Sequence, residues 1–186
     1  MRARLAARVA LGVGILALVL LAVNPAEVAG ALATADLRLV TIGILGLTAM
    51  LRRAWEAGAS VPYPVEQTDH GLLMEYIGDE TMAAPKLAQA RLEPGALASA
   101  WTQLYANLQA LTAAGLVHAD LSVYNLLWWE GRLVLIDLPQ AVEFTTNADA
   151  WDLLHRDVAN VGDWFTRHGL PADVEEVYVD LLTLVH

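Results

Sequence analysis

The stretch from His118 to Gln140, HADLSVYNLLWWEGRLVLIDLPQ, decides the fold of this chain. It places Asp120 and Asn125 five positions apart, and Asp137 follows at the end of an apolar run. Phosphoryl transfer requires a carboxylate that orients the attacking hydroxyl, and an amide oxygen with a second carboxylate that hold Mg2+ on the phosphates. The order and spacing of these residues therefore predict that Asp120 is catalytic and that Asn125 and Asp137 are metal ligands.

The same stretch matches the signature of protein kinases, in which a catalytic loop H-R-D-L-x-x-x-N is followed by D-F-G. The loop residues that match are His118, Asp120, Leu121 and Asn125, and Asp137-Leu138-Pro139 stands in the place of D-F-G. One expected part is missing. Kinases carry a phosphate-binding lysine on a strand before the hinge, but the only lysine here, Lys86, follows the expected hinge.

Length and composition limit the interpretation further. A chain of 186 residues can form one ordinary domain with its own core. The net charge of −10 argues against direct binding to nucleic acid, because neutralising phosphates needs clustered Lys and Arg. The absence of cysteine excludes disulfides and cysteine-based metal sites.

Apolar residues at helical spacing predict the helices of the C-terminal half. One such stripe covers 97–111 and another covers 151–165, and a glycine follows each of them. Asp173 and Glu176 form a capping pair that predicts the start of a last helix. The acidic residues spaced between 149 and 176 are expected on a solvated face.

Short β-rich runs predict a hinge strand and a small hairpin. The run Leu72–Ile77 is expected to form the strand. The runs 126–129 and 133–136 flank Glu130-Gly131, which predicts a tight hairpin turn between them. Upstream, LRRAWEAG reads as the end of a helix that is closed by Gly58. The fold class expected from these elements is α+β, mainly helical.

Two apolar runs precede this domain, at residues 9–23 and at Leu39–Leu51. Arginines lie before the first run, and Arg52 and Arg53 follow the second, so the positive-inside rule places both ends in the cytoplasm. A transmembrane hairpin over residues 9–51, which anchors a cytoplasmic domain, is therefore one interpretation. A spanning helix needs about 20 apolar residues and a signal-peptide core fewer, so a signal peptide is a second interpretation. Buried helices or a shifted reading frame are a third.

Several ordered motifs closely resemble the RIO family of atypical protein kinases. The likeness runs from about residue 50 to about residue 170. The motifs that carry it are EAGASVPYPVE (56–66), LLMEYIGDE (72–80), APKL (84–87), HADLSVYN (118–125), IDLPQAVE (136–143) and WDLLHRDVANVGDWFTRHG (151–169).

The resemblance implies a kinase-like fold without the activation segment and peptide-binding subdomains of ordinary kinases, and it implies ATP and Mg2+ as cofactors. Asp120 resembles the catalytic aspartate, and Asn125 and Asp137 resemble the metal ligands. Asp137 also resembles the carboxylate that accepts a phosphoryl group in family members that act as ATPases. Glu75 and Ile77 resemble the hinge residues whose backbone meets adenine, with Met74 beside them. Several family members act in maturation of the small ribosomal subunit.

The departures from the family pattern lie in the N-terminal part. No glycine-rich phosphate loop with a following lysine precedes the hinge, and Glu56 lies at the wrong end of its helix to pair with such a lysine. The expected organisation is a hydrophobic segment over 1–49 and a RIO-kinase-like domain with an incomplete N-terminal lobe over 50–186.

Three function hypotheses follow. The first is a RIO-type serine/threonine kinase or ATPase that acts with Mg-ATP on an unidentified protein substrate. The second is a membrane-tethered pseudokinase that keeps the fold as a binding module. The third is a truncated or frame-shifted gene product.

Overall fold

A computed structural model describes residues 37–68 and 71–185 of the chain. The compact unit considered below is Gly43–His186. In chain order, the elements are α3 (Leu37–Glu56), β1 (Pro64–Thr68), β2 (Gly71–Met74), the 3-10 turn η1 (Leu87–Gln89), α4 (Pro94–Ala113), β3 (Leu116–Val117), β4 (Leu126–Trp129), β5 (Arg132–Leu135), the 3-10 turn η2 (Leu138–Gln140), β6 (Val142–Glu143), α5 (Ala150–Arg167) and α6 (Val174–Leu182). The mixture of helices with small antiparallel sheets confirms the predicted α+β class.

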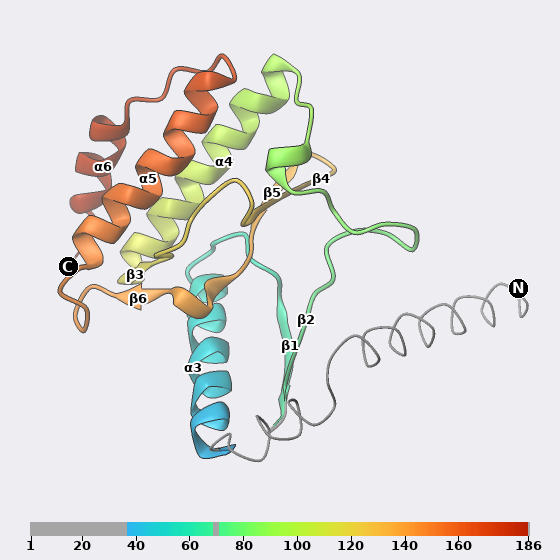
Figure 1. The fold of residues 1–186 in the computed structure, drawn as a ribbon, viewed down its shortest axis with the longest axis vertical. Helices are drawn as coiled ribbons and strands as arrows, with labels where there is room; N and C mark the ends of the chain where they lie inside the picture. The colour runs from blue at the N-terminus through green and yellow to red at the C-terminus, as the bar shows by residue number, and fades with distance from the viewer. Residues whose placement is uncertain (1–36, 69–70, 186) are drawn as a thin grey trace, which may run out of the picture. The chain divides into compact units, whose positions relative to one another are not determined.

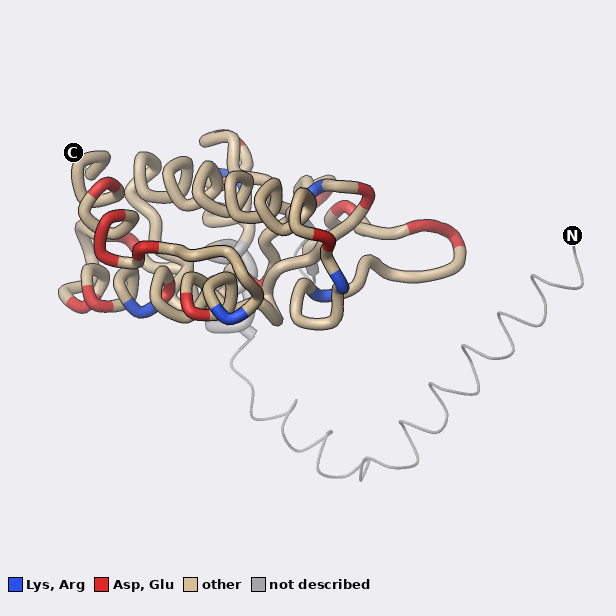
Figure 2. The backbone as a smooth tube through the Cα atoms, turned by 90° about the horizontal axis from the view of Figure 1, so that it is seen from above, with Lys and Arg blue, Asp and Glu red and all other residues tan. Residues whose placement is uncertain are grey.

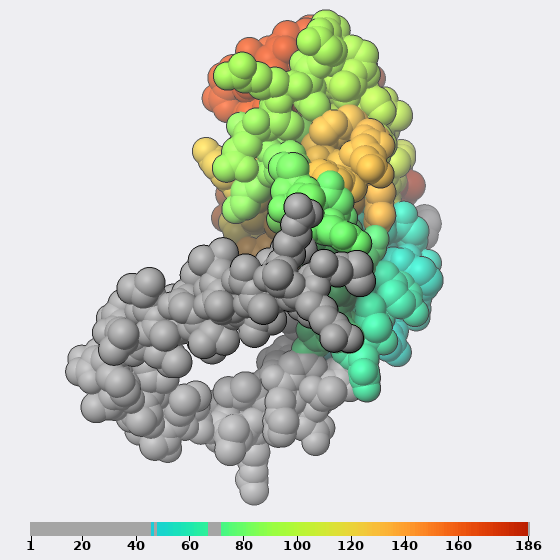
Figure 3. Space-filling model, turned by 90° about the vertical axis from the view of Figure 1, so that its right-hand side faces the viewer, coloured from blue at the N-terminus to red at the C-terminus, as the bar shows by residue number. Residues whose placement is uncertain are grey.

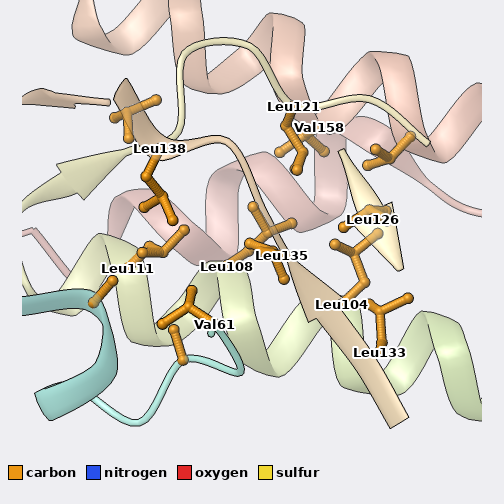
Figure 4. Packing of buried hydrophobic residues seen from close by; sticks show 14 of the residues in the cluster. Val61, Leu104, Leu108, Leu111, Leu121, Leu126, Leu133, Leu135, Leu138 and Val158 are labelled. Atoms are coloured by element: carbon orange, nitrogen blue, oxygen red, sulfur yellow. The ribbon is translucent and has the colours of Figure 1, made fainter. Parts of the chain in front are cut away.

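The core lies between the helices α4 and α5 and the β4–β5 hairpin (Figure 1). Figure 4 shows Leu108 of α4 beside Leu135 and Leu111 of α4 beside Leu138. Leu104, also of α4, lies beside Leu126 and Leu133 of the β4–β5 hairpin. Leu135 of β5 and Val158 of α5 are fully buried against them. The helix stripes predicted from apolar spacing are therefore the faces that build this core, since burying them removes apolar surface from water.

The β4–β5 hairpin follows the sequence prediction closely. Its strands pair in antiparallel register from Leu126 opposite Leu135 to Trp129 opposite Arg132. The two turn residues, Glu130 and Gly131, both have positive φ, 49° and 81°. Positive φ at both positions is the requirement of a type I′ turn, whose twist matches that of paired strands. The other two sheets, β1–β2 and β3–β6, are also two-stranded and antiparallel.

Helix α3 ends where the sequence predicted. Gly58, at φ 88°, donates its N–H to the carbonyl of Trp55, and Ala59 donates to the carbonyl of Ala54. This pair of hydrogen bonds is the Schellman motif that closes a helix at a glycine. The run Leu39–Leu51 belongs to this single helix, and Leu51 and Ala54 near its end are buried in the domain core.

The membrane interpretation finds no support in the described residues. Within 37–68 and 71–185, no helix combines the length and the apolarity that a membrane crossing needs. The first apolar run, 9–23, lies outside the described residues. Arg53, one of the two arginines that follow the second apolar run, forms an ion pair with Glu143, and its Nη2 donates to the carbonyl of Ala114 at 2.9 Å. These contacts fasten the end of α3 to β6 and to the end of α4.

The hinge strand is shorter than predicted. The expected strand Leu72–Ile77 was wrong at its C-terminal end, because β2 stops at Met74. Beyond it the chain closes a tight loop, in which Ala84 donates to the carbonyl of Ile77 at 2.9 Å. Gly78 makes this loop with φ 145°, a value that side chains disfavour. The pairing partner of residue 77 is therefore its own loop rather than β1.

Acidic residues, red in Figure 2, recur along α5 and α6. The predicted cap of α6 is confirmed, since the Asp173 carboxylate accepts the N–H of Glu176 at 3.0 Å. The expectation that this whole acidic series is solvated was wrong for one residue. Asp157 on α5 is completely buried, and the reason lies in the loop that it contacts.

Candidate active site

The loop 118–125 is held from behind by α5. The buried carboxylate of Asp157 accepts two backbone N–H groups, from Ala119 at 2.7 Å and from Leu121 at 3.0 Å. Arg156 donates to the carbonyl of Ala119, and Asn160 donates to that of Leu121 at 3.3 Å. Four hydrogen bonds to the backbone therefore fix the loop on both sides of Asp120.

This bracing determines where Asp120 points. Ala119 has a positive φ of 65°, and the side chain of Leu121 is fully buried. The chain therefore turns sharply at residue 119, and the next apolar side chain anchors in the core. Asp120, between these two positions, is exposed to solvent. His118 is buried as a bracing residue, with Nε2 3.0 Å from the carbonyl of Ile136.

Burial governs the ionisation of Asp157. Removal from water raises the pKa of this carboxyl above its ordinary value. The two N–H bonds, from Leu121 and Ala119, and the nearby His118 lower the pKa and offset part of that shift. Desolvation is the larger effect, so the carboxyl keeps a pKa above its ordinary value.

Asn125 connects the loop to the cavity in front of it. Its side-chain nitrogen donates to the backbone carbonyl of Asp120 at 2.8 Å and to the Asp120 carboxylate at 3.3 Å. With the nitrogen so engaged, the amide oxygen faces away from these two acceptors. The carbonyl of Asn125 accepts the N–H of Ile136 at 3.0 Å, which ties the start of β4 to the residue before Asp137.

Asp137 stands in a backbone conformation that only a few residue types adopt readily. It has φ 68° and ψ 56°, in the left-handed region where Asn and Asp are the commonest residues after glycine. The residue after it, Leu138, is buried, and the side chain of Asp137 is exposed. The turn thus keeps the hydrophobic side chain inside and presents the carboxylate at the surface.

A cavity of about 360 Å³ brings three of the predicted site residues together. Asn125 and Asp137 line it, and so does Met74 of the hinge. The remaining lining residues are Leu51, Pro62, Lys86, Ile136, Leu138 and Pro139. Asp120 does not line this cavity, but the hydrogen bonds of Asn125 place it next to it.

A second, more open hollow of about 660 Å³ adjoins the first and shares Pro62, Met74, Lys86 and Ile136 with it. The other two predicted hinge residues, Glu75 and Ile77, line this hollow. The first cavity and this hollow are together called the cleft below. The face that Figure 3 shows carries the segment after the hinge, in green, against the β4–β5 hairpin, in orange.

Some backbone groups of the hinge are engaged in hydrogen bonds, and others have no backbone partner among the described residues. The N–H of Glu75 donates to the carbonyl of Tyr63 at 2.8 Å, and the carbonyl of Ile77 accepts from Ala84. Among the described residues, the carbonyl of Glu75 and the N–H of Ile77 have no backbone partner. The side chain of Glu75 is occupied elsewhere, since it accepts from the N–H of Tyr63 and pairs with Arg132 at 3.3 Å.

The donor set fits Mg2+ better than a transition metal. Within the described ranges, no group of three or more His, Cys, Asp and Glu side chains is arranged to hold a metal. Mg2+ is usually bound by one or two carboxylates together with substrate phosphates and water. Asn125, with an amide oxygen, and Asp137, with a carboxylate, both line the cavity and match that pattern.

The sequence did not predict several residues that the structure places at the site. Asp157 looked like one more member of an exposed acidic series, although the segment 151–169 that contains it was recognised as a family motif. Leu51 and Pro62 complete the cavity wall from segments far upstream. Lys86 was noted only because it follows the hinge, whereas it lines both parts of the cleft.

Comparison with known proteins gives one family. The model of the RIO domain matches residues 47–177. The RIO-type serine/threonine-protein kinase Rio1 of Haloferax volcanii is 40% identical over 130 residues, which are 70% of this chain and 44% of that protein. The serine/threonine-protein kinase RIO3 of Mus musculus is 37% identical over 127 residues, 68% of this chain and 24% of that protein.

A shorter relative aligns over more of its own length. The RIO-type serine/threonine-protein kinase Rio1 of Thermoplasma acidophilum is 32% identical over 121 residues, which are 65% of this chain and 62% of that protein. The chain therefore spans less than half of the Haloferax protein and about a quarter of the mouse protein. The matched part contains the hinge, the loop 118–125 and Asp137.

Proposed function

The chain belongs to the RIO domain family, and on this premise we propose that it binds Mg-ATP in the cleft and transfers the γ-phosphoryl group, as a RIO-type serine/threonine kinase or ATPase. One observation carries the proposal. A single cavity is lined by the hinge residue Met74 and by the two predicted metal ligands, Asn125 and Asp137. The base and the phosphates of a nucleotide need walls of these two kinds in one cleft.

The hinge would recognise the adenine through its backbone. The carbonyl of Glu75 would accept a hydrogen bond from the exocyclic amine, and the N–H of Ile77 would donate one to a ring nitrogen. Both groups have no backbone partner among the described residues. The apolar side chains of Met74 and Ile77 line the space beside them, where a flat base is sheltered from water.

The other wall would hold the metal and the phosphates. Asn125 would contribute its amide oxygen, which remains available because the nitrogen is bonded to Asp120, and Asp137 would contribute its carboxylate. When bound, Mg2+ neutralises charge on the phosphate oxygens. The hydrogen bonds from Ala119 and Leu121 to Asp157 would hold the loop that leads to Asn125 in place before a ligand binds.

Asp120 would act on the phosphoryl acceptor. Its carboxylate is exposed next to Asn125, where an incoming hydroxyl can approach from solvent. An ionised carboxylate accepts the hydroxyl proton and holds the oxygen in line with the γ-phosphorus. The acceptor itself is proposed to be a serine or threonine of a protein substrate, as the names of the relatives suggest for those proteins.

A catalytically impaired nucleotide-binding module is the second candidate. The observation that favours it is the absence of any lysine N-terminal to the hinge. Kinases use such a lysine to hold the α- and β-phosphates, and positioning supplies most of the catalysis of phosphoryl transfer. This candidate keeps the nucleotide-binding cleft but loses turnover.

Calorimetry with Mg-ATP on the full chain tests the binding that both candidates share. We expect binding that requires Mg2+ and disappears when the metal is chelated. ATP labelled at the γ-phosphate then separates the activities. A stable phosphate on serine or threonine assigns the kinase, a hydroxylamine-labile label on Asp137 assigns the ATPase, and binding without label assigns the impaired module. Absence of Mg-ATP binding by the wild-type chain would overturn the proposal.

Replacing Asp120 with Asn is expected to abolish transfer but to spare binding. The amide keeps the size of the side chain and an acceptor for Asn125, but it cannot take a proton. General-base catalysis by a positioned carboxylate contributes about 10²–10⁴-fold, so the rate should fall by that factor. The affinity for Mg-ATP should stay within about twofold, because Asp120 does not line the cavity. A transfer rate equal to that of the wild type would remove Asp120 from the mechanism.

A further inference from the structure

We propose that Lys86 binds the polyphosphate of the nucleotide in the cleft. The inference rests on the proposed binding of Mg-ATP and adds a residue to that site. Lys86 is the only lysine in the sequence, and it follows the hinge rather than preceding it. In kinases the positive charge comes from a lysine on a strand before the hinge. Here the ammonium group of Lys86, which lies after the hinge in the sequence, would supply that charge.

The backbone around Lys86 is fixed by its neighbours. Lys86 forms an antiparallel bridge with Leu127 of β4, and the N–H of Trp128 donates to the carbonyl of Pro85 at 3.1 Å. The carbonyl of Lys86 accepts the N–H of Gln89 at 2.8 Å, which starts the turn η1. The next side chain, Leu87, is completely buried. The root of the Lys86 side chain is therefore held at a defined place on the wall of the cleft.

Lys86 lies where the two parts of the cleft meet. It lines the first cavity together with Asn125 and Asp137, and it lines the adjoining hollow together with Glu75 and Ile77. A nucleotide whose base contacts the hinge and whose terminal phosphates reach Asp137 has its ribose and proximal phosphates between these points. The four-carbon side chain of lysine gives its ammonium group access to that region.

Lys86 differs from the other basic residues near the site in its position and in its lack of an ion-pair partner among the described residues. It is the only basic residue among those that line either part of the cleft. Three arginines near the site are engaged elsewhere, since Arg53 pairs with Glu143, Arg132 pairs with Glu75, and Arg156 contacts the carbonyl of Ala119. The side chain of Lys86 is exposed, and no residue of 37–68 or 71–185 forms an ion pair with it.

The net charge of −10 strengthens the need for such a cation. The sequence has 21 acidic and 11 basic residues, and Figure 2 marks where the acidic positions lie along the described backbone in red and the basic positions in blue. A triphosphate that approaches an acidic protein meets a repulsive field, and local cations in the site must offset it. Lys86 is the basic side chain at the position where this offset is needed.

Calorimetric titration of three variants tests the inference. Lys86→Met removes the charge but keeps an unbranched side chain, Lys86→Arg keeps the charge, and Arg91→Met is the matched control. Arg91 is an exposed basic residue five positions later that lines neither part of the cleft. The ligands are Mg-ATP, Mg-ADP and adenosine, which share the base and ribose and differ in their phosphates.

We expect Lys86→Met to weaken Mg-ATP and Mg-ADP binding by about tenfold, the usual effect of one charge-assisted hydrogen bond, and to leave adenosine binding unchanged. Lys86→Arg should restore most of the lost affinity, and Arg91→Met should bind all three ligands like the wild type. The affinity of the wild type for Mg-ATP should also fall more steeply with salt than that of Lys86→Met, because screening weakens only the charged contact.

Other outcomes would overturn the inference. If Lys86→Met binds Mg-ATP like the wild type while Asp137→Asn does not, Lys86 has no phosphate contact and the proposed function stands. If adenosine weakens as much as Mg-ATP, Lys86 packs against the base or ribose instead. If the wild-type chain binds no Mg-ATP, the proposed function and this inference fail together.

A covalent probe gives an independent readout, because the chain has one lysine. An acyl phosphate of ATP transfers its acyl group to an amine beside the phosphates, forming an amide and releasing ATP. We expect mass spectrometry to find the acyl group on Lys86 and excess Mg-ATP to suppress it by about tenfold, with adenosine much less effective. Labelling of Lys86 that Mg-ATP does not suppress would place this lysine away from the phosphates.

Discussion

Replacing Asp137 with Asn should abolish metal-dependent binding of ATP and, with it, phosphoryl transfer. Asp137 is the only acidic residue among the described residues that line the cavity, and Mg2+ prefers charged oxygen ligands. Metal stabilisation of the transferring phosphoryl group contributes several kcal/mol, so the rate of transfer should fall by on the order of 10³-fold. Calorimetry with Mg-ATP and a transfer assay measure the two effects.

Asn is the appropriate substitute because of the backbone at this position. Asp137 has φ 68°, and Asn tolerates this left-handed conformation better than Ala does. The fold should therefore be unchanged, with a denaturation midpoint near that of the wild type. A loss of binding in Asp137→Asn can then be assigned to the missing charge rather than to a distorted turn.

Comparison with Asp120→Asn separates the role of Asp137 as a metal ligand from the role of Asp120 in transfer. That variant should lose transfer and keep Mg-ATP binding, whereas Asp137→Asn should lose both. Asp163→Asn, an exposed carboxylate on α5, is the matched control and should lose neither. If Asp137→Asn bound Mg-ATP with unchanged affinity, Asp137 would not be a metal ligand in this chain.

Replacing Asp157 with Ala should cause the largest loss of stability. The substitution leaves two backbone N–H groups, of Ala119 and Leu121, without the acceptor that each now has in the interior. An unsatisfied buried donor costs about 1–3 kcal/mol, so the free energy of unfolding should fall by roughly 3–5 kcal/mol. Domains are stable by only about 5–15 kcal/mol, which makes this loss easy to measure by chemical denaturation.

Two further variants show whether a loss of stability in Asp157→Ala comes from the missing hydrogen-bond acceptor. Asp157→Asn keeps one acceptor oxygen and should lose only part of the stability, whereas Asp163→Ala, on the exposed side of α5, should stay within about 0.5 kcal/mol of the wild type. If Asp157→Ala were as stable as Asp163→Ala, the contacts from Arg156 and Asn160 would suffice to fix the loop.

The pH dependence of stability reports on the same carboxyl. Burial raises the pKa of Asp157 above its ordinary value of 3.8, so the folded chain keeps this proton at pH values where the unfolded chain has lost it. Ionisation of Asp157 therefore lowers the free energy of unfolding as the pH rises from 3.8 through the folded-state pKa. Asn does not titrate. The stability of the wild type relative to Asp157→Asn should consequently decrease with rising pH across that window.

Features that depend on neighbouring residues were predictable. The turn at Glu130-Gly131 needs two residues that accept positive φ, and its strands follow directly. The end of α3 at Gly58 and the cap at Asp173 are also local, since their hydrogen bonds join residues at most five positions apart. Sequence patterns describe such features because the interacting residues are close in the chain.

Features that depend on distant partners were not predictable. Strands β3 and β6 have two residues each, and only their pairing with one another makes them strands. The strand that was expected to continue to Ile77 ended at Met74, because Ile77 pairs with Ala84 instead. No local pattern indicates which of several apolar neighbours a short segment will choose.

The amino-acid sequence was sufficient to identify the family and to predict Asp120, Asn125 and Asp137 as site residues, because their chemistry and spacing lie in one continuous stretch. It also determined that a single lysine exists and that it follows the hinge. The tertiary structure alone decided that Asp157 is a buried support rather than a surface charge, since the N–H groups it accepts lie 38 and 36 positions upstream. It likewise decided that Lys86 faces the cleft, because the bridge to Leu127 is made only when β4 has folded against the hinge segment.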